Sequence, residues 1–148
     1  MTAKLNVALM QIDLFWEDKE SNLQAIEEKV YSLPEHIDLV ILPEMFTTGF
    51  TMDPSKNAES MSGETVTWMR KLAKEKNAAI TGSVVIKEIS KNLKETLYFN
   101  RLLFVHPSGD VEYYDKKHTF TLAGEHEVYT AGKDRICLLY TSPSPRDS

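Results

Sequence analysis

The chain has 148 residues, of which 42% are hydrophobic and 26% are charged, and its formal net charge is −5. This length and composition suit one soluble globular domain with a buried core, and they exclude fibrous, collagen-like and wholly disordered proteins. The basic residues are scattered and are outnumbered 22 to 17 by acidic ones, so no surface for binding nucleic acid is predicted.

The first predicted element is a strand from Leu5 to Ile12. Its two faces are both mostly apolar, which predicts an interior strand that is covered on both sides. The few residues before it form neither a basic region nor a long apolar stretch, and no later apolar run could span a bilayer. We therefore expect a cytoplasmic protein with no membrane partner.

A helix and a second strand follow. The helix is predicted over Lys19 to Leu33, with Asp18 or Ser21 as its cap, because apolar residues recur there at spacings of three and four. These apolar residues are Leu23, Ile26, Val30 and Leu33. The second strand is predicted over Ile37 to Leu42. The order strand, helix, strand indicates a crossover between parallel strands and therefore an α/β fold.

The rest of the chain to residue 115 is predicted to form an irregular segment, a helix and three strands. Gly82, inside the first of these strands, permits the close approach of another backbone. The last two strands flank a turn and form an antiparallel pair. The irregular segment is either the wall of a pocket or a surface excursion. In chain order the ranges are Phe46 to Ser62, Gly63 to Lys76, Ala78 to Ile86, Thr96 to Val105 and Val111 to Asp115.

A carboxylate directly follows the second strand. Pro43 has no amide hydrogen to donate to a sheet and stops the strand, so Glu44 is placed at a strand end, where open α/β sheets carry their chemistry. Glu44 is therefore a candidate general base. The alternative is that Glu44 merely begins a solvated loop.

A second charged group lies at the end of the last strand, where Asp115 precedes Lys116, Lys117 and His118. A lysine held beside a carboxylate stays protonated and can donate to an oxygen that becomes negative during acyl transfer. Neither spacing nor composition shows that Lys116 and Glu44 meet in space, but acyl transfer by this pair requires that they face each other across one cleft. Taken alone, the segment also fits a charged surface turn.

Four ordered segments carry a family resemblance. They are Leu-Pro-Glu-Met-Phe-Thr-Thr-Gly-Phe (Leu42 to Phe50), Tyr-Phe-Asn-Arg-Leu (Tyr98 to Leu102), Tyr-Asp-Lys-Lys-His-Thr-Phe (Tyr114 to Phe120) and Gly-Glu-His-Glu-Val-Tyr-Thr-Ala-Gly (Gly124 to Gly132). Together they resemble the nitrilase superfamily of carbon-nitrogen hydrolases, and within it the bacterial omega-amidases. The likeness runs collinearly from Leu5 to about Arg135.

The resemblance implies a Glu-Lys-Cys triad that hydrolyses a linear amide through a thioester. Glu44 would be the general base and Lys116 would stabilise the oxyanion. Glu125 would be the supporting glutamate, with Glu127 as the alternative. Phe46 and Thr47 would line the pocket next to Glu44.

The resemblance also implies a fold and partners. The family fold is a four-layer α-β-β-α sandwich, which this chain would contain only in part. A small amide substrate, a homo-oligomer in the full-length form, and no metal or organic cofactor are implied. Sister activities in the superfamily include nitrile and N-carbamoyl amino acid hydrolysis, and pocket loops discriminate between them.

The nucleophile departs from the family pattern. Cys137 follows Gly132 by five positions, whereas the family places its cysteine after a further pair of strands. We therefore predict that residues 1–135 are the N-terminal part of a hydrolase domain, that residues 136–148 are a non-native, unstructured tail, and that this chain is inactive. The competing hypothesis is a non-catalytic binding domain on the same scaffold.

Overall fold

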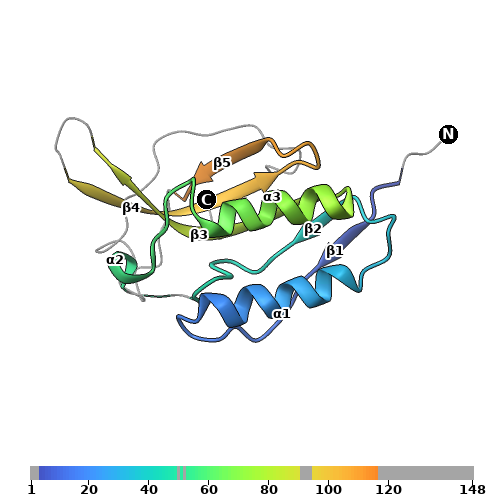
Figure 1. Cartoon of the computed structure of the whole chain (residues 1–148), viewed down its shortest axis with the longest axis horizontal. Coiled ribbons are helices and arrows are strands. Elements are labelled where there is room, and N and C mark those ends of the chain that lie inside the picture. The colour runs from blue at the N-terminus through green and yellow to red at the C-terminus, as the bar shows by residue number, and fades with distance from the viewer. Residues whose placement is uncertain (1–3, 50, 52, 91–94, 117–148) are drawn as a thin grey trace.

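The computed structural model of the chain describes residues 4–49, 51, 53–90 and 95–116 (Figure 1). The predicted α/β class is confirmed, with five strands in one sheet and three helices in this part of the chain. In chain order the elements are β1 (Val7–Leu9), α1 (Lys19–Tyr31), β2 (Leu39–Ile41), α2 (Pro54–Asn57), α3 (Glu64–Lys76), β3 (Ala79–Ile89), β4 (Thr96–Val105) and β5 (Val111–Asp115).

The sheet has the order β1-β2-β3-β4-β5, so each strand pairs with its neighbours in the sequence. The strands β1, β2 and β3 are parallel, whereas β3, β4 and β5 pair antiparallel, as the sequence predicted. The two long helices, α1 and α3, both lie over the same face of this sheet (Figure 1). None of the helices in the described ranges is long and apolar enough to cross a membrane.

The main core lies between the helices and the sheet. Ile26 and Val30 of α1 and Met69 of α3 are fully buried against Ile80 of β3 and Leu103 of β4. Ile26 and Val30 are among the positions that the helical spacing of apolar residues predicted to face inward. The opposite face of the sheet carries a smaller apolar cluster of Leu39, Ile41, Ala79 and Phe104.

The ends of the helices are fixed by polar contacts. Of the two predicted caps for α1, Asp18 is the N-cap, and its carboxylate accepts from the Ser21 amide at 3.2 Å. Helix α3 begins after Gly63, which has no capping side chain, and the Glu59 carboxylate accepts from the Thr65 amide at 3.1 Å instead. Such contacts satisfy amides that have no partner within the helix.

Two predictions from the sequence are corrected. The strand expected from Leu5 to Ile12 is reduced to β1, and it lies at the edge of the described sheet rather than in its interior. An apolar pattern on both faces does not distinguish an edge from an interior position, because it reports side chains and not the pairing of the backbone. The irregular segment after Glu44 also contains the short helix α2, which starts at Pro54 with Asp53 as its cap.

The exposed edge leads to a testable expectation. Leu5, Val7 and Leu9 are 69%, 45% and 63% exposed along one side of the edge strand, which favours pairing with other chains. We expect the isolated chain to bind a hydrophobic dye and to show a mass that rises with concentration in sedimentation experiments. Leu9→Lys should reduce this association, whereas Tyr31→Lys, on the exposed side of α1, should not. A monodisperse monomer at all concentrations would contradict the expectation.

Candidate active site

The backbone after β2 delivers Glu44 beside β3. The Leu42 amide still donates to the Thr81 carbonyl at 2.8 Å, as the next rung of the parallel ladder. Pro43 then has no amide to donate, and the chain is fastened again at Met45, whose amide donates to the Ser83 hydroxyl at 2.7 Å. Glu44 is thus held between two anchored residues at the end of a strand, as its position after Pro43 predicted.

The end of β5 delivers the lysine. The pairing of β4 with β5 places Arg101 opposite Asp115, and the Lys116 amide extends the same ladder by donating to the Asn100 carbonyl at 3.0 Å. Lys116 therefore lies opposite Asn100. Because side chains alternate along strands, the side chains of these two residues project from the same face of the sheet.

The side chains of Lys116 and Asn100 both contact one carboxylate oxygen of Glu44. The Lys116 ammonium donates to Glu44 Oε1 at 2.9 Å, and the Asn100 amide donates to the same oxygen at 3.1 Å. The predicted contact between Glu44 and Lys116, which are 72 positions apart in the sequence, is confirmed. The lysine side chain is 15% exposed and the glutamate side chain 35%.

This arrangement has two of the groups that acyl transfer uses, a carboxylate and an ammonium. A carboxylate that is partly open to solvent can accept a proton from a nucleophile. An ammonium at 2.9 Å from that carboxylate is held in one position and can donate to a developing oxyanion nearby. The contact alone does not assign either role.

An ion-pair cluster on the helix-covered face holds the end of β5 in place. Arg101 is 1% exposed, and its guanidinium donates to both oxygens of Asp115, at 2.5 and 2.9 Å, and to Glu88 at 2.9 Å. Burial lowers the pKa of Arg101, but the hydrogen bonds to Asp115 and Glu88 outweigh it and raise the pKa above its ordinary value. Arg101 thereby fixes the residue that directly precedes Lys116.

The two predicted pocket residues point into the protein. The Phe46 side chain is fully buried, and its ring lies 5.9 Å from that of Trp68 in the main core. Thr47 is also buried, and its carbonyl accepts from the side chain of Asn22 at 2.7 Å. Both residues anchor the segment that carries Glu44, and their contact with a substrate stays a prediction.

Several sequence predictions fall outside the described residues. The supporting glutamate, Glu125 or Glu127, lies beyond residue 116, as do Lys117 and Cys137. The predicted tail, residues 136–148, lies there too.

Gly82 makes room for two neighbouring side chains, whereas the sequence predicted the close approach of another backbone. A Cβ atom at this position would lie 2.9 Å from Leu42 Cβ and 2.9 Å from two carbons of the Phe46 ring. Phe46 has no room to move because it is fully buried against Trp68. The bare backbone of β3 therefore lets the segment around Glu44 pack directly on the strand.

We expect Gly82→Ala to lower the free energy of unfolding by about 1–3 kcal/mol, the usual cost of overpacking a core. Urea unfolding measures the loss. Adding Phe46→Leu should restore part of it, because the shorter side chain returns space to the new methyl group. If Gly82→Ala unfolds like the parent chain, the close packing at Gly82 is not rigid.

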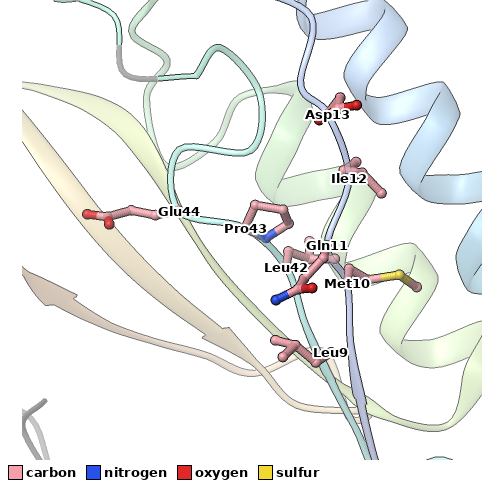
Figure 2. Close-up of a pocket in the computed structure, with 8 residues that line it drawn as sticks. All are labelled: Leu9, Met10, Gln11, Ile12, Asp13, Leu42, Pro43 and Glu44. Carbon is pink, nitrogen blue, oxygen red and sulfur yellow. The ribbon is translucent and has the colours of Figure 1, made fainter.

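A surface hollow lies beside this site. It has a volume of about 560 Å³ and is lined by residues 9–13 and 42–44. Figure 2 shows that the Glu44 side chain is directed away from the other lining residues, and its carboxylate is the one that contacts β4 and Lys116. The hollow therefore touches the backbone of Glu44 and not its reactive group, and we assign no chemistry to it.

Asn100 and Ser83 are two polar residues beside Glu44 whose contacts the sequence reasoning did not foresee. Asn100 is buried in the middle of β4, and Ser83 is buried in β3. A usable signal was present, since a polar residue inside an otherwise apolar strand needs a partner. The partner could be found only from the register that sets Asn100 opposite Lys116.

Comparison with known proteins gives a consistent result. The family model of carbon-nitrogen hydrolases matches residues 6–140. An omega-amidase from Yersinia enterocolitica is 38% identical over 131 residues, which cover 88% of this chain and 48% of the relative. A 2-oxoglutaramate amidase from Bacillus subtilis is 26% identical over 136 residues, covering 88% of this chain and 49% of the relative.

A solved structure agrees with these relatives. A carbon-nitrogen hydrolase superfamily protein from Xanthomonas campestris, crystallised with an arsenic adduct in its active site, superposes with a TM-score of 0.84 and is 38% identical. The match covers 95% of this chain and 51% of that protein. This chain spans about half the length of the curated relatives that it matches.

Proposed function

This chain belongs to the carbon-nitrogen hydrolase family, and we propose that it supplies the general base and the oxyanion-stabilising cation of an enzyme that hydrolyses linear amides. The observation that carries the proposal is the 2.9 Å contact between the Lys116 ammonium and Glu44 Oε1. A base and a cation held together at strand ends are the two groups that a thiol nucleophile needs beside it.

The reaction runs in two halves. Glu44 takes the proton of a cysteine thiol, and the sulfur attacks the amide carbon. The carbonyl oxygen becomes negative and accepts a hydrogen bond from Lys116. When the C–N bond breaks, the protonated Glu44 returns its proton to the departing nitrogen, so ammonia leaves and a thioester remains. Water then attacks the thioester with Glu44 again as base, which releases the acid and the thiol.

The relatives suggest a substrate class. Two of them are named for ω-amide and 2-oxoglutaramate hydrolysis. We therefore propose that the complete enzyme hydrolyses ω-amides of 2-oxo acids. Glu125 would support Lys116 or Glu44 as a second carboxylate, and Phe46 and Thr47 would shape the pocket wall through the segment that they anchor.

The nucleophile belongs to a longer protein in this proposal. Cys137 lies closer to Gly132 than the family pattern places its cysteine. Residues 1–135 would be the N-terminal part of the complete enzyme, residues 136–148 would not be native to it, and the 148-residue chain would not turn over substrate.

The experiment measures ammonia release from 2-oxoglutaramate. The 148-residue chain should release none, with or without Cys137→Ser. The complete gene product, expressed from the native locus that encodes residues 1–135, should release ammonia at a measurable kcat. Turnover by the 148-residue chain that Cys137→Ser abolishes would show that the nucleophile is misplaced. A native reading frame without any hydrolase activity would favour the binding domain instead.

A further inference from the structure

We propose that Asn100 is a positioning residue that fixes the rotation of the Glu44 carboxylate, so that proton transfer takes place at Oε2. The inference rests on the proposed function, because it assigns Asn100 a part in the work of the general base. It adds a residue to the reaction that the Glu-Lys-Cys scheme does not include.

The sheet register makes the contact specific. Asn100 lies opposite Val85 of β3 on one side and opposite Lys116 on the other. Its side chain is 2% exposed, and its amide nitrogen lies 3.1 Å from Glu44 Oε1. A buried amide in the middle of a strand has few rotamers available, so the hydrogen bond holds one orientation.

Both donors select the same oxygen of the carboxylate. The Lys116 ammonium and the Asn100 amide reach Oε1, at 2.9 and 3.1 Å. Oε2 accepts no hydrogen bond from residues within the described ranges. With Oε1 occupied from two directions, the carboxylate plane cannot rotate freely. Oε2 is then the oxygen that can take the proton of the nucleophile and later return it to the leaving nitrogen.

The chemical type of the second donor also matters. A second cation next to Glu44 would add another charge that pairs with the carboxylate, as Lys116 already does. A neutral amide orients the carboxylate without adding a charge. Lys116 is the charged side chain that contacts Glu44 in the part of the chain that the structure describes. The site thus combines one cation for charge with one neutral donor for orientation.

The test uses the complete gene product and its ammonia-release assay. Asn100→Leu keeps the branched shape of the side chain and removes the donor, and we expect kcat to fall about 10- to 100-fold with KM within about twofold, as for a misplaced catalytic group. Asn100→Asp replaces the amide with a carboxylate of the same size and should lower kcat at least as much. Tyr114→Phe, one residue pair along the same face, is the matched control and should keep the parental kcat.

The folded fraction separates positioning from a loss of folding. Urea unfolding should show Asn100→Leu folded under the assay conditions, and the loss should then appear in kcat with KM nearly unchanged. A merely structural role would lower kcat only in proportion to the folded fraction.

The outcomes distinguish this inference from the proposed function. If the parent enzyme releases no ammonia, the proposed function fails. If the parent is active and either Asn100 variant keeps the parental kcat per folded enzyme, only the positioning role is overturned. Should Asn100→Leu fail to fold, Asn100→Asp, which keeps the side-chain size, decides the matter by its kcat and its folded fraction.

Discussion

Glu44→Gln in the complete gene product is expected to lower kcat for amide hydrolysis by about 10²- to 10⁴-fold, the range typical of a lost general base. The amide of glutamine cannot accept a proton from the nucleophile, although its oxygen can still accept hydrogen bonds from Lys116 and Asn100. The substitution thus removes the chemistry while preserving the contacts at Oε1. Steady-state ammonia release measures kcat, and urea unfolding checks that stability is unchanged.

Three further variants test this prediction. Glu20→Gln, on the exposed surface of α1, removes the same charge away from the site and should leave kcat unchanged. Lys116→Met should lower kcat by about 10²- to 10³-fold, as expected for one oxyanion donor. The double variant should be little worse than Glu44→Gln, because groups that act together are not additive. If Glu44→Gln keeps the parental kcat, the base is another residue.

The helices and the hairpin could be predicted because their signals are local. The apolar spacing around Ile26 and Val30 identified α1, and the turn after β4 identified the antiparallel pair. Both patterns depend on residues within a few positions of each other, and the structure preserves them. The lengths of β1 and β2 are set instead by pairing between distant segments, which composition does not reveal.

The two charged residues of the site could be predicted from the sequence, but the orientation of the side chains around them could not. Pro43 marked Glu44 as a strand-end carboxylate, and the end of a hairpin marked Lys116. The orientation of Phe46 escaped prediction because Met45 adopts a positive φ of 50°, which turns the chain and sends the ring of Phe46 into the core. No local sequence pattern predicts a positive φ for a methionine.

Asn100 shows a further reason why sequence reasoning stops short. Its contact with Glu44 depends on the register of β4 with β5 and on the position of the segment after β2. These two relations involve residues 16 and 56 positions away, and each is fixed only when the whole sheet forms. A site that is assembled from several strands is therefore harder to predict from the sequence than the strands themselves.

Arg101→Met is expected to lower the free energy of unfolding by about 3 kcal/mol, the lower end of the range for removing one partner of a buried ion pair. The variant leaves Asp115, which is 15% exposed, without the guanidinium that donates to both of its oxygens. It also removes a cation that lies 4.1 Å from the centre of the Tyr113 ring. Urea unfolding of the complete gene product, followed by tryptophan fluorescence, measures the loss.

The effect should reach the site through the backbone, because Lys116 directly follows Asp115. We therefore expect kcat to fall in Arg101→Met even under conditions where the protein stays folded. Glu88→Gln is the matched control: its carboxylate is 46% exposed, so the loss should stay below about 1 kcal/mol, as for surface ion pairs. Adding Asp115→Leu to Arg101→Met should recover stability, since no buried charge is then left unpaired. If Arg101→Met and Glu88→Gln unfold at the same urea concentration, the cluster does not hold β5 in place.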